Sequence, residues 1–232
     1  MSSSGHLVLV PRLLGWSYAE LDPAARKSFE VAVHLGSAAA LALVTRSELA
    51  ALRAHEVWLV ALTAVPPAAA GLAFERLVER HLGSVRSVAL AQVVAGAGLW
   101  LADRTPTNRT EAGVIDALAV GGGQAAALWP GVSRSGAAIT VARLRGLDRP
   151  ASARLSRRAA LPIAAGSAAW KGFRAARAGL PHDLYAPFAA GALTALASGL
   201  AARGLARRVE HAGSYAPFSV YRIALGLSAL LR

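Results

Sequence analysis

Two clusters of small polar residues, 131 positions apart, contain the residue types that bind phosphate. The first spans Ser2 to His6 (SSSGH), and the second spans Ser133 to Gly136 (SRSG). Hydroxyls and the N–H groups at a helix start donate hydrogen bonds to anionic oxygens, an arginine supplies positive charge, and a histidine exchanges protons near neutral pH. Both clusters adjoin strongly apolar sequence, where polar groups are costly to bury without a polar partner. We therefore predict that the two clusters form one shared anion site.

The second cluster interrupts an apolar stretch directly after Pro130 and Gly131. These two residues break a helix, and they are flanked by the apolar segments Val114–Trp129 and Ala137–Leu144. The second segment is too short to cross a bilayer. Non-helical backbone at membrane depth is tolerated where protein covers it or where it lines a wet cavity. We predict a re-entrant helical hairpin, in which a helix that starts near Ser133 points its N–H groups at a ligand.

The composition indicates the kind of protein that must hold this hairpin. Of 232 residues, 55% are hydrophobic and only 16% are charged, with a mean hydropathy of +0.43. This is more apolar surface than a soluble domain of this length buries, so an integral membrane protein is favoured over the alternative of a soluble, alanine-rich helical bundle. Apolar segments of roughly spanning length lie near residues 31–45, 57–75, 85–102, 155–170, 184–204 and 216–231.

The net charge of +12 argues for contact with lipid headgroups. The 25 lysines and arginines outnumber the 13 acidic residues, but they lie mostly in connectors between apolar segments and do not gather on one polar face. This distribution argues against a nucleic-acid partner and favours anionic headgroups. The connectors are basic on both sides, so the charge pattern leaves the orientation in the membrane open. The chain has no cysteine, which excludes disulfides and thiolate metal sites.

The duplicated clusters predict the architecture. Inverted repeats whose broken helices point at a shared ligand are an established membrane arrangement. We predict an all-α, polytopic integral membrane helical bundle with an inverted repeat and one or more re-entrant helical hairpins. The whole chain, residues 1–232, is expected to be a single membrane domain with repeat halves of roughly 1–111 and 112–232.

These clusters resemble the motifs of the undecaprenyl-diphosphate phosphatase family, also called the bacitracin-resistance family. The sequence from Pro130 to Ile139 is similar to the family signature PG-x-SRSG-x-T-I, and residues 2–7 are similar to its first motif. Further matches occur in the same order along the chain at Phe29-Glu30-Val31 with Leu35-Gly36, Gln124, Gly146 to Arg149, Pro217-Phe218, and Tyr221 to Gly226.

The resemblance implies a function and a location. The family hydrolyses undecaprenyl diphosphate to the monophosphate carrier lipid and inorganic phosphate. This reaction recycles the carrier for peptidoglycan and other envelope polymers and opposes bacitracin, which sequesters the diphosphate. The implied location is the bacterial cell membrane (the plasma or inner membrane), where the chain would be multi-pass. The implied partner is a polyprenyl diphosphate lipid.

The resemblance also implies roles for residues. Ser3 matches the family's functional serine and would attack phosphorus or position a water molecule, while His6 would act as base or acid. Arg134 would stabilise the equatorial phosphate oxygens. Whether Ser3 forms a phosphoserine or His6 activates water directly is left open by the motif spacing. The expected phosphate-binding residues are Ser2, Gly5, Gly131, Ser133, Ser135 and Gly136.

The family's metal ligands are missing from this sequence. Its usual pattern has an apolar helix before the first motif, with two glutamates four positions apart. Such glutamates share a helix face and suit a divalent cation, most simply Mg²⁺. The metal ligands of this chain are therefore unknown. We predict that the natural start lies upstream of Met1, and an in-frame stop codon with no preceding glutamate-bearing helix would contradict this.

The sequence leaves two alternative functions open. A non-enzymatic protein that binds or translocates a polyprenyl phosphate would use the same repeat and the same Arg134 cradle, and an inactive, truncated homologue would retain the motifs without the reaction. The pairing of Ser3 with His6 favours an enzyme, because simple anion binding needs no base. The sequence also leaves a homo-oligomer open.

Overall fold

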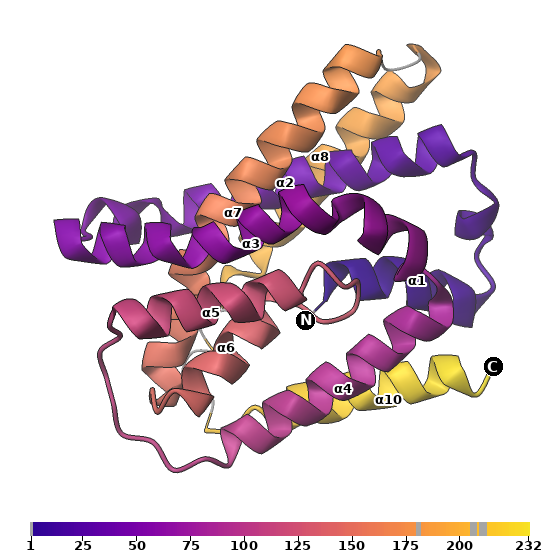
Figure 1. Cartoon of the computed structure of the whole chain (residues 1–232). Coiled ribbons are helices and arrows are strands. Elements are labelled where there is room, and N and C mark those ends of the chain that lie inside the picture. The colour runs from indigo at the N-terminus through magenta and orange to yellow at the C-terminus, as the bar shows by residue number, and fades with distance from the viewer. Residues whose placement is uncertain (1, 180–181, 205–207, 209–212) are drawn as a thin grey trace. The chain divides into compact units, whose positions relative to one another are not determined.

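The structure, a computed structural model, describes residues 2–179, 182–204, 208 and 213–232. Helices dominate the described residues (Figure 1), and the β-structure among them is limited to one isolated bridge between Arg109 and Leu147. The predicted all-α fold is confirmed. Met1, on which the predicted upstream start depends, lies outside the described residues.

The chain forms two compact units that interleave along the sequence. The first contains Met1–Ala19, Ala54–Ala160 and Val209–Arg232, and the second contains Glu20–Arg53 and Leu161–Arg208. Both repeat halves thus contribute to both units. The single domain with halves 1–111 and 112–232 stays a prediction.

The first unit contains both polar clusters. Within it, α4 packs against α10 and α6, α3 packs against α5, α5 packs against α6, and α1 lies on α4 and α10. Its helices are α1 (Ser3–Leu14), α3 (Ala54–His81), α4 (Val85–Asp103), α5 (Val114–Ala126), α6 (Arg134–Leu144), the first part of α7 (Arg149–Ala178) and α10 (Ala216–Leu230).

The second unit is built on a close helix pair. Helices α2 (Pro23–Ala50) and α8 (Tyr185–Ala201) pack along each other. A Cβ at Gly36 would lie 2.1 Å from the carbonyl oxygen of Ala192, so only glycine permits this approach. The unit also contains the later part of α7 and the short 3-10 helix η2 (His182–Leu184). A second 3-10 helix, η1 (Ser17–Glu20), joins α1 to α2.

Four helical segments of the described chain are long and apolar enough to cross a membrane: Ser28–Ala50, Ala54–Phe74, Val85–Asp103 and His182–Ala201. They coincide with four of the six predicted segments. The other two predicted segments also form helices, but α10 has only 15 residues and α7 carries several arginines near its start. Large apolar side chains remain exposed on these helices, as a lipid-facing surface requires. A polytopic membrane bundle is confirmed.

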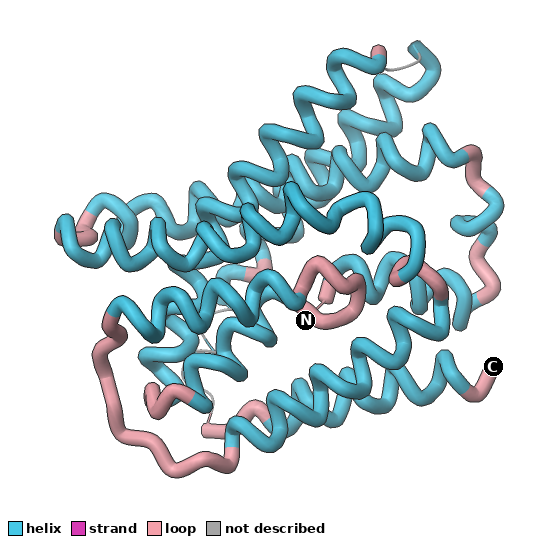
Figure 2. Tube along the Cα trace, viewed as in Figure 1, coloured by secondary structure: helices cyan, strands magenta, loops and turns pink. Residues whose placement is uncertain are grey.

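The predicted hairpin is formed by α5 and α6. These helices have 13 and 11 residues, fewer than the roughly 20 needed to span hydrocarbon. Residues 127–133 between them are not helical, and Figure 2 shows this turn beside the N-terminal end of the chain. Helix α6 begins at Arg134 with Ser133 as its N-cap, as predicted.

The predicted inverted repeat is visible where α4 crosses α10, which lie side by side in Figure 1. A Cβ at Gly96 would lie 3.2 Å from Cβ of Arg222, and a Cβ at Gly226 would lie 3.3 Å from Cβ of Gln92. The contacts are reciprocal, and the two helices run antiparallel. Gln92 and Gly96 precede Arg222 and Gly226 by 130 positions, nearly the spacing of the polar clusters. The crossing is therefore approximately two-fold symmetric.

Candidate active site

The two polar clusters adopt the same local structure. Ser2 is the N-cap of α1, and its Oγ accepts a hydrogen bond from the N–H of Gly5 at 3.2 Å. Ser133 caps α6 in the same way, with Oγ 3.2 Å from the N–H of Gly136. Each cap leaves the first N–H groups of its helix near small side chains, where an anion is stabilised by the helix dipole. The repeat seen in the sequence is thus a repeat of two N-capped helix starts, a local structure that can bind an anion.

The two helix starts meet at glycines. A Cβ at Gly5 would lie 3.3 Å from Cα of Gly131. Gly131 has a φ of +104°, and a Cβ there would lie 2.5 Å from the carbonyl oxygen of Val88 on α4. A side chain at either glycine would force these segments apart. The prediction that the clusters lie together is confirmed.

Ser133 has a strained backbone. Its φ of +70° is the only positive φ of a non-glycine residue among the described residues. Such a conformation persists only where the surroundings enforce it, and it concentrates at functional sites. The adjacent turn is held by Arg222, whose Nη2 donates to the carbonyl oxygens of Gly131 at 2.9 Å and Val132 at 2.7 Å.

Two predicted residues have side chains available to a ligand. Arg134 is half-buried at the start of α6, and its guanidinium forms no hydrogen bond or ion pair with the described part of the chain. The Ser3 side chain is exposed and likewise forms no hydrogen bond there. A half-buried cation without a counterion is costly in apolar surroundings unless an anion binds it.

His6 is held at both ring nitrogens. Nδ1 lies 2.6 Å from the carbonyl oxygen of Ser2, and Nε2 lies 2.8 Å from the hydroxyl of Tyr221. The Ser2 carbonyl accepts only, so Nδ1 carries a proton. In neutral His6, Nε2 is therefore the unprotonated nitrogen, and the Tyr221 hydroxyl donates to it.

Sequence reasoning assigned no role to Gln92, Tyr221 or Arg222. Arg222 is 1% exposed and Gln92 is 0% exposed, and Nε of the arginine donates to Oε1 of the glutamine at 3.0 Å. Nη1 of Arg222 and Nε2 of Gln92 have no partner among the described residues. The sequence did contain a signal: Arg222 lies in an apolar segment, where an arginine is rare without a role.

These unpaired donors lie beneath the two helix starts. A Cβ at Gly136 would lie 2.7 Å from Nη1 of Arg222, and a Cβ at Gly5 would lie 2.8 Å from Nε2 of Gln92. Glycine at both positions lets the donors approach the backbone. Positive charge and donor groups therefore surround the meeting point of the clusters, and the charge on Arg222 lacks a carboxylate partner in the described chain.

The described residues do not form a site that fits a divalent cation. The described residues contain no group of three or more His, Cys, Asp or Glu that could hold a metal ion. Several carboxylates instead pair with arginines: Asp116 with Arg109 at 2.6 Å and with Arg145 at 2.9 Å, Asp103 with Arg149 at 2.6 Å, and Glu56 with Arg158 at 2.8 Å. The cation and its ligands stay a prediction.

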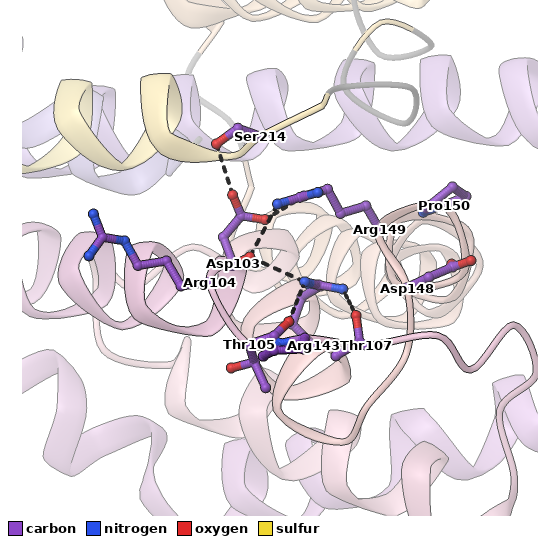
Figure 3. Close-up of a pocket in the computed structure, with 10 residues that line it drawn as sticks. Asp103, Arg104, Thr105, Thr107, Arg143, Asp148, Arg149, Pro150 and Ser214 are labelled. Carbon is purple, nitrogen blue, oxygen red and sulfur yellow. Dashed lines mark hydrogen bonds and ion pairs between the residues drawn. The ribbon is translucent and has the colours of Figure 1, made fainter.

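A separate polar pocket of about 590 Å³ lies at the end of α4 (Figure 3), and none of its lining residues belongs to the polar clusters. Asp103 accepts from Arg149 at 2.6 Å and from Ser214 at 2.9 Å, and Arg143 donates to Thr107 and to backbone carbonyls. Burial, reinforced by Asp103, raises the pKa of the adjacent Tyr215 to about 12. These interactions tie loops together, so we assign the pocket a structural role.

The fold and the site define a class of protein. The molecule is a polytopic membrane protein with an inverted repeat, in which two capped helix starts lie close together and Arg134 at the second start forms no hydrogen bond or ion pair with the described residues. The chain belongs to the family described as bacitracin resistance protein BacA, which it matches over residues 1–228.

Curated relatives agree with this assignment. An undecaprenyl-diphosphatase of Geobacter sulfurreducens is 35% identical, over 99% of this chain and 90% of the relative. One of Moorella thermoacetica is also 35% identical, over 97% of this chain and 88% of the relative. One of Teredinibacter turnerae is 31% identical, over 98% of this chain and 90% of the relative. The similarity therefore extends over nearly the whole length of both proteins.

Proposed function

We propose that this protein hydrolyses undecaprenyl diphosphate to undecaprenyl phosphate and inorganic phosphate. The observation that carries the proposal is the free guanidinium of Arg134 at one of two matched helix starts that meet at Gly5 and Gly131. This arrangement suits a terminal phosphate, and the named activity of the relatives supports the same substrate. The activity would recycle the carrier lipid for cell-wall synthesis and oppose bacitracin.

In this proposal the N–H groups at the starts of α1 and α6 bind the diphosphate oxygens, with Ser135 and Gly136 at the second start. Arg134 stabilises the negative charge on the equatorial oxygens as the terminal phosphoryl group transfers. Ser3, whose hydroxyl is unengaged, attacks the terminal phosphorus or positions a water molecule that does so. His6 accepts the proton that the attacking hydroxyl loses.

We also propose a divalent cation, Mg²⁺, on the basis of family resemblance. It would neutralise charge on the diphosphate when bound. The described residues do not provide its carboxylate ligands, so the steps above depend only on groups of this chain. The proposed location is the bacterial cytoplasmic membrane, where the apolar helices meet the lipid substrate.

Phosphate release from undecaprenyl diphosphate by the purified protein in detergent tests the function. We expect turnover by the wild type, with kcat lower by about 10²–10³-fold in Arg134→Ala and about 10²–10⁴-fold in His6→Ala. Arg104→Ala is the matched control, because Arg104 stacks on Trp100 away from the clusters.

The possible results separate the alternatives. Unchanged release in both site variants would refute the site assignment. Binding of undecaprenyl phosphate without any phosphate release would instead support a non-enzymatic binding or transport protein.

A further inference from the structure

Helix α10 reaches both polar clusters with two consecutive residues. Arg222 binds the turn before the second cluster, and Tyr221 binds His6 of the first. Arg222 is buried, whereas Tyr221 is 42% exposed and its hydrogen bond to His6 is not buried. Tyr221 is therefore placed to act on the reaction through His6.

The contact between Tyr221 and His6 fixes the imidazole. The two rings are nearly parallel, with an interplanar angle of 10° and centroids 5.7 Å apart. The hydroxyl lies 2.8 Å from Nε2, and the Ser2 carbonyl lies 2.6 Å from Nδ1. The ring thus has one position, one tautomer when neutral, and a partner at each nitrogen.

This geometry limits how His6 can work as a base. Neutral imidazole has one lone pair in the ring plane that accepts a proton. In His6 that lone pair is on Nε2, and the Tyr221 hydroxyl already donates to it. The Ser3 hydroxyl forms no hydrogen bond to His6 in the described structure. A proton that His6 accepts at Nε2 must therefore come through the tyrosine hydroxyl or displace it from that nitrogen.

We propose that Tyr221 relays the proton between the attacking hydroxyl and Nε2 of His6. The inference rests on the proposed hydrolysis. The Tyr221 hydroxyl gives its proton to Nε2 and takes the proton of the attacking hydroxyl, so His6 gains one proton and the tyrosine is unchanged. The attacking oxygen bonds to the terminal phosphorus, the bridging P–O bond breaks, and its electron pair stays on undecaprenyl phosphate. Where the attacking oxygen is that of Ser3, a water molecule then attacks the phosphoserine, which releases inorganic phosphate and restores the serine hydroxyl. The imidazolium then returns its proton to solvent by the same route.

Replacing Tyr221 by phenylalanine removes the relay and keeps the ring. We expect kcat for phosphate release to fall about 10- to 100-fold in Tyr221→Phe, part of the gain that general acid–base catalysis provides, with KM nearly unchanged. Tyr185→Phe is the matched control, because Tyr185 also packs against a histidine, His182, with ring centroids 5.0 Å apart, but lies outside the unit that contains the clusters.

A double-mutant cycle separates a relay from a merely structural contact. If Tyr221 acts through His6, the variant with both His6→Ala and Tyr221→Phe has the same kcat as His6→Ala alone. If the double variant instead loses kcat by the product of the two single-variant factors, the proposal is overturned. A Tyr221→Phe variant with unchanged or higher kcat would also overturn it.

A chemical measurement tests the contact without turnover. Diethyl pyrocarbonate reacts with an unprotonated imidazole nitrogen, and mass spectrometry of the N-terminal peptide reports its addition to His6. We expect several-fold faster modification in Tyr221→Phe, because Nε2 then lacks its tyrosine partner. Equal rates would overturn the inference. If the wild type releases no phosphate, the proposed function fails, and this rate still reports whether Tyr221 holds Nε2.

Discussion

At the scale of single residues, Arg222 depends on the planar, multidentate geometry of its guanidinium as well as on its positive charge. Its guanidinium donates at once to Gln92 and to the carbonyl oxygens of Gly131 and Val132. We expect Arg222→Lys to keep the charge, to lose the simultaneous bonds and to release the strained turn at Ser133. Hydrogen bonds from charged groups contribute about 1.5–3 kcal/mol, so kcat/KM should fall roughly 10- to 100-fold.

The control for this substitution is Arg232→Lys. Arg232 also donates to a backbone carbonyl, that of Leu13 at 2.5 Å, but it does so at the exposed end of the chain. We expect the control to keep the wild-type kcat/KM. Wild-type activity in Arg222→Lys would show that charge alone suffices at this position.

The sequence was sufficient to predict the residues that belong to a repeated motif. Ser2 and Ser133 were expected to act alike, and both are N-caps with the same 3.2 Å hydrogen bond. The partners of the motifs were not predicted, because Gln92, Tyr221 and Arg222 come from helices distant in sequence. Hydrophobic pattern places such residues on a helix but does not indicate which loop they reach.

At the scale of elements, the crossing of α4 and α10 depends on glycine. A Cβ at Gly226 would lie 2.6 Å from the carbonyl oxygen of Ala89 and 2.7 Å from Cγ2 of Val93. A backbone carbonyl cannot move away as a flexible side chain can. Gly226→Ala should therefore push the two helices apart and lower the free energy of unfolding by about 1–3 kcal/mol. We expect a lower Tm in detergent and reduced phosphate release, because α10 positions both Tyr221 and Arg222.

Gly122→Ala is the matched control for this crossing. Gly122 lies within α5, and a Cβ there meets no atom within 4 Å. Alanine should therefore leave Tm unchanged or raise it, since alanine favours the helix. A Tm for Gly226→Ala equal to that of this control would refute the close crossing.

The elements themselves were largely predictable, but their ends and partners were not. The segments predicted near 85–102, 184–204 and 216–231 became helices with ends within a few residues of those predicted. The segments predicted near 31–45, 57–75 and 155–170 became the longer helices α2, α3 and α7. In α2, for example, the helix extends beyond its apolar residues and includes polar residues such as Arg26. Hydropathy detects the apolar part of a helix and misses its polar ends.

At the scale of the whole molecule, phosphate release should depend on a divalent cation. We expect release by the purified protein to fall in EDTA and to return on addition of excess Mg²⁺, because a cation held by the diphosphate oxygens would neutralise part of their charge. Ca²⁺ in place of Mg²⁺ tests the preference for a small cation. Equal release with and without EDTA would refute the proposed cation and leave Arg134 and Arg222 as the charge that acts on the diphosphate.

The two-fold crossing also bears on how such a chain could arise. If each half had first existed as a separate protein that paired with its own copy, the axis would carry two identical side chains, either two glutamines or two arginines. Two arginines would repel, and two glutamines would bring no charge. In the single polypeptide the two equivalent positions differ, and the mixed pair of Gln92 and Arg222 forms a hydrogen bond of 3.0 Å that two identical side chains of either kind could not form in the same way. At this pair of positions the chain carries one positive charge, whereas two identical halves would carry two or none.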